Sequence, residues 1–117
     1  MEGFISALNA LDVDRIAGYL ASDVTVFVPT VQAGRVSGKA AVVEIFRDYV
    51  NATKKNVART AIVPEDPLIE FGGDVAVVSF TVKSSSSVAR RTFVFRRHGD
   101  TWLIGHFHAS NLPLPRQ

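Results

Sequence analysis

The second half of the chain carries the pattern that most restricts the fold. Residues 57–111 read almost throughout as β-strand, rich in valine, threonine and phenylalanine. Gly72–Gly73–Asp74 and His98–Gly99–Asp100 are turn sequences of the kind that join hairpin strands. Strands joined by such short turns pair antiparallel. We therefore expect an antiparallel sheet whose last strand is Thr101–Asn111.

The first half predicts helices that cover one face of this sheet. Apolar residues recur at helical spacing over Phe4–Leu11 and Ile16–Leu20, and most clearly over Lys39–Asn51. Between these segments, Val24–Val28 is a β-rich run that Pro29 ends. The two prolines that follow residue 63 predict a bend in the sheet. The expected fold is α+β, a strongly curved antiparallel sheet wrapped around three helices of the N-terminal half, with an internal pocket.

Size and composition fit one globular domain over residues 1–112, followed by a short tail at 113–117. The net charge of +2 is too small to indicate nucleic acid or a membrane surface. Four arginines at 90, 91, 96 and 97 fall on both faces of one predicted strand, which disperses any nucleic-acid footprint. There is no cysteine and no apolar run near the ~18 residues of a membrane span. A cytoplasmic protein is expected, without nucleic-acid or membrane partners.

Two motifs point to a family. Phe27–Val28–Pro29 is followed by Gly34, Val36 and Gly38, and the last strand reads Trp-x-Ile-x-His-Phe-His-x-Ser from Trp102 to Ser110. Both resemble the association (hub) domain of calcium/calmodulin-dependent protein kinase II, within the nuclear transport factor 2-like superfamily of SnoaL-like proteins. The element order matches over nearly the whole chain.

The resemblance implies a cone-shaped fold with a deep pocket, and dimers or rings built from the convex sheet face. The superfamily also includes ketosteroid isomerases, polyketide cyclases, dehydratases and limonene epoxide hydrolases, so the family alone gives no activity.

Strict alternation divides the last strand into two faces. The hub domains place a cavity-facing basic residue at the position of Ala109, so the resemblance assigns Leu103, Gly105, Phe107 and Ala109 to the cavity. The other face would then form the subunit interface, made of Trp102, Ile104, His106, His108 and Ser110.

The same alternation on neighbouring strands predicts a largely apolar cavity lining. Arg91, with Arg35, would lie at its mouth and accept one acidic group of a small, mainly apolar ligand. The alternative is that these side chains simply fill the core. The predicted ligand-binding residues are Val28, Phe46, Tyr49, Phe80, Val82, Arg91, Phe93, Phe95, Phe107 and Ala109.

Catalytic residues are not assigned, and whether the protein is an enzyme stays open at this stage. His106 and His108, with Tyr19, are the alternative acid/base set of a cyclase, isomerase or dehydratase. The position of the isomerase base holds Val28, and no Asp–Arg–Asp set of the epoxide hydrolase kind faces inward. A metal needs a third protein ligand, and the preceding strand offers none. No metal or cofactor is therefore expected.

The leading prediction is a pocketed module that dimerises through its convex sheet and takes a small, mainly apolar ligand. The alternatives are an enzyme that uses His106 or His108, and a purely structural oligomerisation domain, either as a dimer or as a larger ring.

Overall fold

The computed structural model describes residues 1–29, 34–56, 61–84 and 86–114. Its elements, in chain order, are α1 (Glu2–Asn9), α2 (Val13–Gly18), β1 (Leu20–Phe27), β2 (Val36–Ser37), α3 (Lys39–Lys54), β3 (Glu65–Gly72), β4 (Val75–Lys83), β5 (Ser87–His98) and β6 (Thr101–Pro113).

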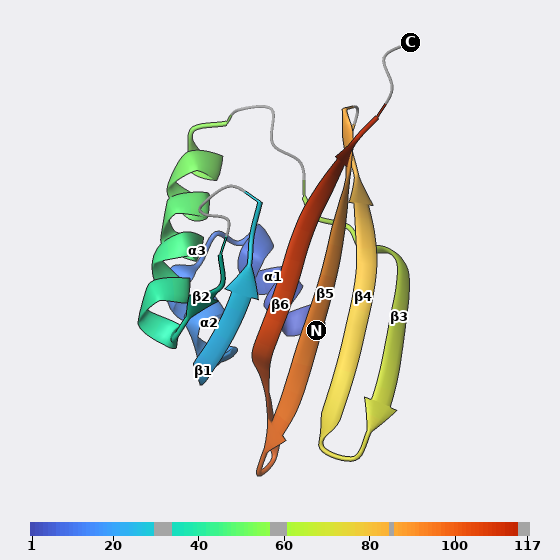
Figure 1. Ribbon diagram of the computed structural model, residues 1–117. Coiled ribbons are helices and arrows are strands. Elements are labelled where there is room, and N and C mark those ends of the chain that lie inside the picture. The colour runs from blue at the N-terminus through green and yellow to red at the C-terminus, as the bar shows by residue number, and fades with distance from the viewer. Residues whose placement is uncertain (30–33, 57–60, 85, 115–117) are drawn as a thin grey trace.

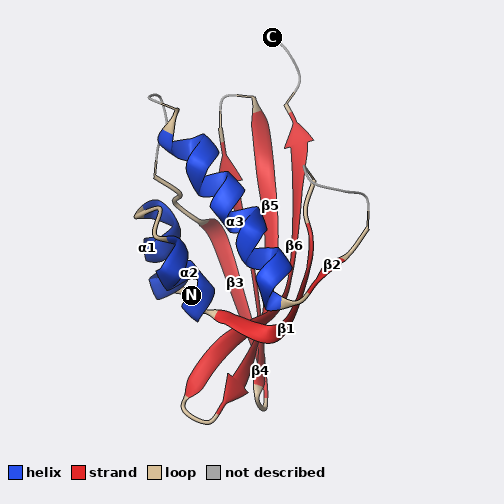
Figure 2. Ribbon diagram, turned by 90° about the vertical axis from the view of Figure 1, so that its left-hand side faces the viewer, coloured by secondary structure: helices blue, strands red, loops and turns tan. Residues whose placement is uncertain are grey.

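The six strands form one sheet in the order β2-β1-β6-β5-β4-β3 (Figure 1). All neighbours pair antiparallel except β1 and β6, which are parallel. The three helices lie on one face of this curved sheet (Figure 2), which we call the inner face; the opposite, convex face is the outer face. The predicted α+β fold, a curved sheet wrapped around three helices, is confirmed.

Local sequence explains where the helices begin. The Asp12 carboxylate caps α2 by accepting a hydrogen bond from the Arg15 backbone N–H at 3.1 Å. Gly38 precedes α3 with a φ of 94°, a conformation that favours glycine. Along α3, one stripe at helical spacing is buried against the sheet: Val42, Phe46 and Val50.

The hairpins also follow the sequence, because the two predicted turns join β3 to β4 and β5 to β6. Gly73 and Gly99 take the positive φ angles that tight turns need. The strand expected over 57–63 is not formed at 61–63, and its first four residues lie outside the described part of the chain. β1 begins at Leu20, four residues earlier than expected, where it pairs with Ile104 of β6.

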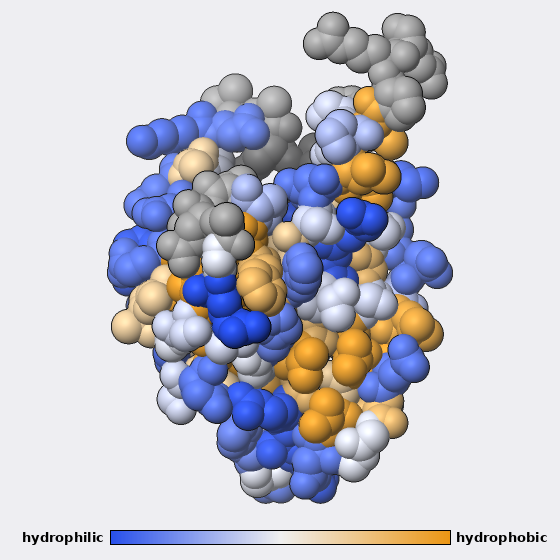
Figure 3. Space-filling model, in the orientation of Figure 1, coloured by the Kyte–Doolittle hydropathy of each residue, from blue (hydrophilic) through white to orange (hydrophobic). Residues whose placement is uncertain are grey.

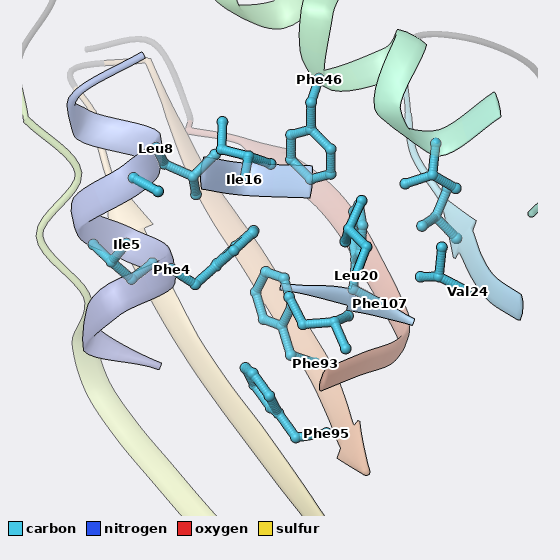
Figure 4. Packing of buried hydrophobic residues seen from close by; sticks show 14 of the residues in the cluster. Phe4, Ile5, Leu8, Ile16, Leu20, Val24, Phe46, Phe93, Phe95 and Phe107 are labelled. Atoms are coloured by element: carbon cyan, nitrogen blue, oxygen red, sulfur yellow. The ribbon is translucent and has the colours of Figure 1, made fainter. Parts of the chain in front are cut away.

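The core lies between the helices and the inner sheet face (Figure 4). Phe4 of α1 and Phe46 of α3 meet phenylalanines of β5 and β6 at its centre, with ring centroids 5.4 Å apart for Phe4–Phe93 and 5.5 Å for Phe46–Phe107. Such edge-to-face and tilted pairs stabilise a core beyond the apolar area that they bury.

Candidate functional site

A bulge in β6 changes the predicted division of this strand into two faces. His106 pairs with Val94, whereas Phe95 pairs with Ile104, so Gly105 is an extra residue. Before Gly105 the even-numbered residues of β6 face inward, whereas from His106 onward they face outward. Phe107 and Ala109 face inward as expected, and His106, His108 and Ser110 face outward.

The expectation was wrong for the first part of β6. Ile104 has no exposed area and lies in the core instead of on the outer face. Trp102 also lies on the inner side, where the centroid of its ring is 6.2 Å from that of the Phe71 ring. Leu103, expected in the cavity, is opposite Arg96 and faces outward. Alternation along the strand does not by itself reveal a bulge, but a glycine in the middle of a strand is a recognised sign of one.

The two histidines lie on the outer face beside β1. His106 Nδ1 is 2.7 Å from the Thr25 hydroxyl oxygen, a hydrogen-bonding distance. The Phe27 ring lies 5.8 Å from the His106 ring and 5.4 Å from the His108 ring. Burial lowers the pKa of His106, and the positive charge of Arg35 acts in the same direction. The neutral imidazole is therefore the favoured form.

Tyr19 is not brought to these histidines. Its ring packs edge to face on Phe4 at 5.9 Å, on the inner side of the sheet, and its hydroxyl lies against Gly3 of α1. The alternative acid/base set is thus divided between opposite faces of the sheet.

Apolar side chains form a row across the outer face. Val77 of β4 is opposite Val94 of β5, and Val94 is opposite His106. Val75, at the start of β4, is 38% exposed. Figure 3 shows hydrophobic side chains gathered over the lower part of β4 and β5. We call Val75, Val77, Val94 and Leu103 the outer row.

The predicted cavity residues on the inner face divide into two groups. The phenylalanine side chains are buried and touch one another, with ring centroids 5.3 Å apart for Phe93–Phe107 and 5.8 Å for the stacked pair Phe80–Phe93. Phe95 joins them at 6.3 Å from Phe93. These rings belong to the packed core, and their role as ligand contacts stays a prediction.

The second group lies at one end of this core, around Arg91. Arg91 is between Phe80 of β4 and Ala109 of β6 in the sheet. Val28 and Val82 pack against the core while partly exposed, and Tyr49 of α3 is more exposed still.

Arg91 has unusual surroundings for a half-buried cation. Its Nη1 donates hydrogen bonds to the Ser110 and Arg90 carbonyl oxygens, each at 3.0 Å, and to Asn111 Oδ1 at 3.3 Å. Within the described residues it pairs with no carboxylate: the ion pairs found there involve Arg47, Arg96 and Arg97. Burial lowers the pKa of Arg91, while the nearby Tyr49 raises it. A guanidinium desolvated in this way favours an anionic partner.

A separate hollow of about 480 Å³ lies between α1 and the segment that leads into β3. It is lined by Met1, Glu2, Ile5, Ser6, Asn9 and Pro64, none of which was predicted as a ligand contact. Asn9 holds this segment through two hydrogen bonds to the Ile62 backbone, which is a contact between residues too far apart in sequence for pattern reasoning to find.

Two further properties concern the described residues only. Among them, no group of three or more histidine and acidic side chains is placed to hold a metal ion. The helices that they form include none long and apolar enough to cross a membrane.

Comparison with known proteins assigns the family. A family model described as a SnoaL-like domain matches residues 1–115, so the chain belongs to the SnoaL-like family of nuclear transport factor 2-like proteins. A search of curated proteins found no match.

Solved structures with the same fold carry several kinds of name. A Streptomyces avermitilis protein of the NTF2-like family, described as a candidate dehydratase, is 19% identical with a TM-score of 0.77, over 95% of this chain and 90% of that one. A candidate calcium/calmodulin-dependent protein kinase type II association domain from Thiobacillus denitrificans is 23% identical with a TM-score of 0.73, over the same shares. A candidate ketosteroid isomerase from Parabacteroides distasonis is 21% identical with a TM-score of 0.69, over 92% and 80%. At these identities the likeness concerns the fold.

Proposed function

We propose that this protein is a ligand-binding module that dimerises through its outer sheet face. Its ligand is a small, mainly apolar molecule with one acidic group, bound at the end of the core where Arg91 lies. The proposal includes a cytoplasmic location, as expected from the sequence.

The state of Arg91 carries the ligand proposal. A half-buried guanidinium that pairs with no carboxylate of the described residues has lost hydration that its carbonyl and amide contacts replace only in part. Nη1 donates all of the guanidinium's hydrogen bonds within the described residues, so the N–H groups of Nε and Nη2 remain as donors to a ligand. A bound carboxylate would supply the missing negative charge with two parallel hydrogen bonds.

The neighbours of Arg91 suit an apolar tail. Phe80 and Ala109 flank it in the sheet, and the partly exposed Val28 and Val82 lie at the edge of the core. A carboxylate on Arg91 would place an attached hydrocarbon chain against these side chains. Burial of that chain would add roughly 0.8 kcal/mol for each methylene removed from water.

Calorimetry with octanoate tests this directly, with octylamine as a ligand of the same tail and opposite charge. We expect octanoate to bind the wild-type protein and octylamine not to bind. Arg91→Met keeps much of the side-chain volume and removes the charge, so it should weaken octanoate binding about ten-fold or more, because charge-assisted hydrogen bonds contribute about 1.5–3 kcal/mol. Arg90→Met, an exposed neighbour on the other face, is the matched control. Equal octanoate affinity in the two variants would refute the role of Arg91.

The outer row supports self-association. Val75 is exposed, and Val77, Val94 and Leu103 are partly exposed. A second copy presents the same apolar surface and can cover it. Static light scattering should give the mass of a dimer for the wild-type protein and of a monomer for Val94→Lys. A monomeric wild-type protein would contradict this part of the proposal.

A purely structural oligomerisation domain is the second candidate, favoured by the similarity to association domains. It predicts an intact dimer or larger ring that binds neither octanoate nor octylamine. The enzyme alternative has less support, because His106 and His108 lie on the opposite sheet face from Tyr19 and Arg91.

A further inference from the structure

The strand β3 forms one edge of the sheet and is exposed along its whole length. It is the last strand in the sheet order and pairs only with β4 among the described residues (Figure 1). All eight of its residues are exposed. An edge strand of this kind presents backbone N–H and C=O groups that can pair with an added strand.

Apolar side chains project from both faces of β3. Ile69 and Phe71, opposite the buried Val78 and Ala76, lie on the inner side and are 48% and 73% exposed. Leu68, opposite Ser79, is on the outer side and is 55% exposed. A strand added beside β3 would cover apolar surface on both faces as well as pair the backbone.

The charge of β3 indicates what kind of strand fits. Its charged residues are Glu65, Asp66 and Glu70, and it has no lysine or arginine, although the whole chain has a net charge of +2. Within the described residues none of these acids forms an ion pair; the acids that do are Asp23, Glu44 and Asp74. The edge therefore presents negative charge that no described residue neutralises.

We propose that β3 binds an extended, basic and apolar peptide segment of another protein as an additional strand. Backbone hydrogen bonds would supply affinity, and alternating lysine or arginine side chains would meet the β3 acids. A second copy fits less well. In an antiparallel β3–β3 pair centred on the strand, Glu70 would lie opposite Pro67 of the other copy and diagonal to its Glu65 on the same face. Like charges would then be brought together across the strands, which disfavours this pairing.

The test uses a fluorescein-labelled peptide of alternating lysine and valine, and a matched peptide of alternating glutamate and valine, measured by fluorescence anisotropy. The lysine peptide should bind and the glutamate peptide should not. A triple variant of β3, Glu65→Gln with Asp66→Asn and Glu70→Gln, should weaken binding about ten-fold, because each removed charge contributes modestly at an exposed site. A triple variant of helix acids, Asp14→Asn with Glu44→Gln and Asp48→Asn, removes the same charge elsewhere and should bind as the wild type does.

A second peptide separates strand addition from charge attraction alone. N-methylation of alternate residues along one edge keeps the side chains and charge but removes the backbone donors, and should abolish binding. Circular dichroism melts of both triple variants verify that they are folded. Equal binding of the two parent peptides, equal effects of the two triple variants, or full binding by the methylated peptide would each overturn the proposal. A larger assembly of the wild-type protein that forms without peptide binding and is lost when β3 is altered would also overturn it, because a second copy would then be the occupant.

Discussion

Replacement of Phe93 by alanine would decide whether the inner phenylalanines are packed core or the wall of an open pocket. Phe93 is 4% exposed and its ring contacts four others, with centroids 5.3 Å from Phe107, 5.4 Å from Phe4, 5.8 Å from Phe80 and 6.3 Å from Phe95. A buried phenylalanine replaced by alanine costs about 3–5 kcal/mol, and the four ring contacts place this site in the upper part of that range.

Urea unfolding followed by circular dichroism measures this loss, with Phe27→Ala as the matched control. Phe27 is a partly exposed phenylalanine on the outer face, so its replacement should cost much less. A domain of this size has roughly 5–15 kcal/mol of stability in total, so Phe93→Ala should lower the unfolding midpoint markedly with a similar m-value. A loss for Phe93→Ala no greater than for Phe27→Ala would refute the packed-core reasoning and favour a pocket at this position.

Two further perturbations test single contacts. Asn9→Ala removes both hydrogen bonds to the Ile62 backbone and should lower the free energy of unfolding, measured in urea, by about 1–3 kcal/mol. Ser6→Ala on the same helix is the control and should be nearly neutral. Equally small losses in the two variants would contradict the role of Asn9. The pKa of His106 is lowered from its usual 6.5, so the folded protein favours the neutral imidazole. The stabilisation that the neutral His106 gives the folded state is complete above pH 6.5. It is lost as the pH falls from 6.5 through the lowered pKa of the folded state. Unfolding midpoints at about pH 7.5 and about pH 5 should therefore differ less in His106→Gln than in the wild type, and an identical difference would be evidence against the shift.

The sequence predicted those parts of the fold that depend on local patterns. The glycine turns at 73 and 99 identified the hairpins, and the apolar stripe of α3 identified both the helix and its buried face. The parallel pairing of β1 with β6 was not predictable in the same way, because it joins segments about eighty residues apart and leaves no local pattern.

The candidate site was predicted in part, for a similar reason. Alternation separated His106 and His108 from Phe107, and the resemblance to the hub domains at Ala109 indicated which of the two faces is inward. Alternation holds only within one regular stretch. The bulge at Gly105 ends that stretch, and this is why Ile104 and Trp102 were assigned to the wrong face. The half-buried state of Arg91 depends on contacts with β6, so the sequence could suggest its position near a cavity mouth but not its surroundings.

We propose different roles for the two sheet faces, with self-association on the outer face. The chain contains no cysteine, so single-cysteine variants can carry one spin label each. Thr92→Cys places the label on the outer face beside His108, and Ala41→Cys places it on an exposed position of α3. Sheets packed face to face lie about 10 Å apart, so pulsed dipolar spectroscopy should give a much shorter label-to-label distance at position 92 than at position 41. A shorter distance at position 41, or no dipolar coupling at either position, would contradict the claim.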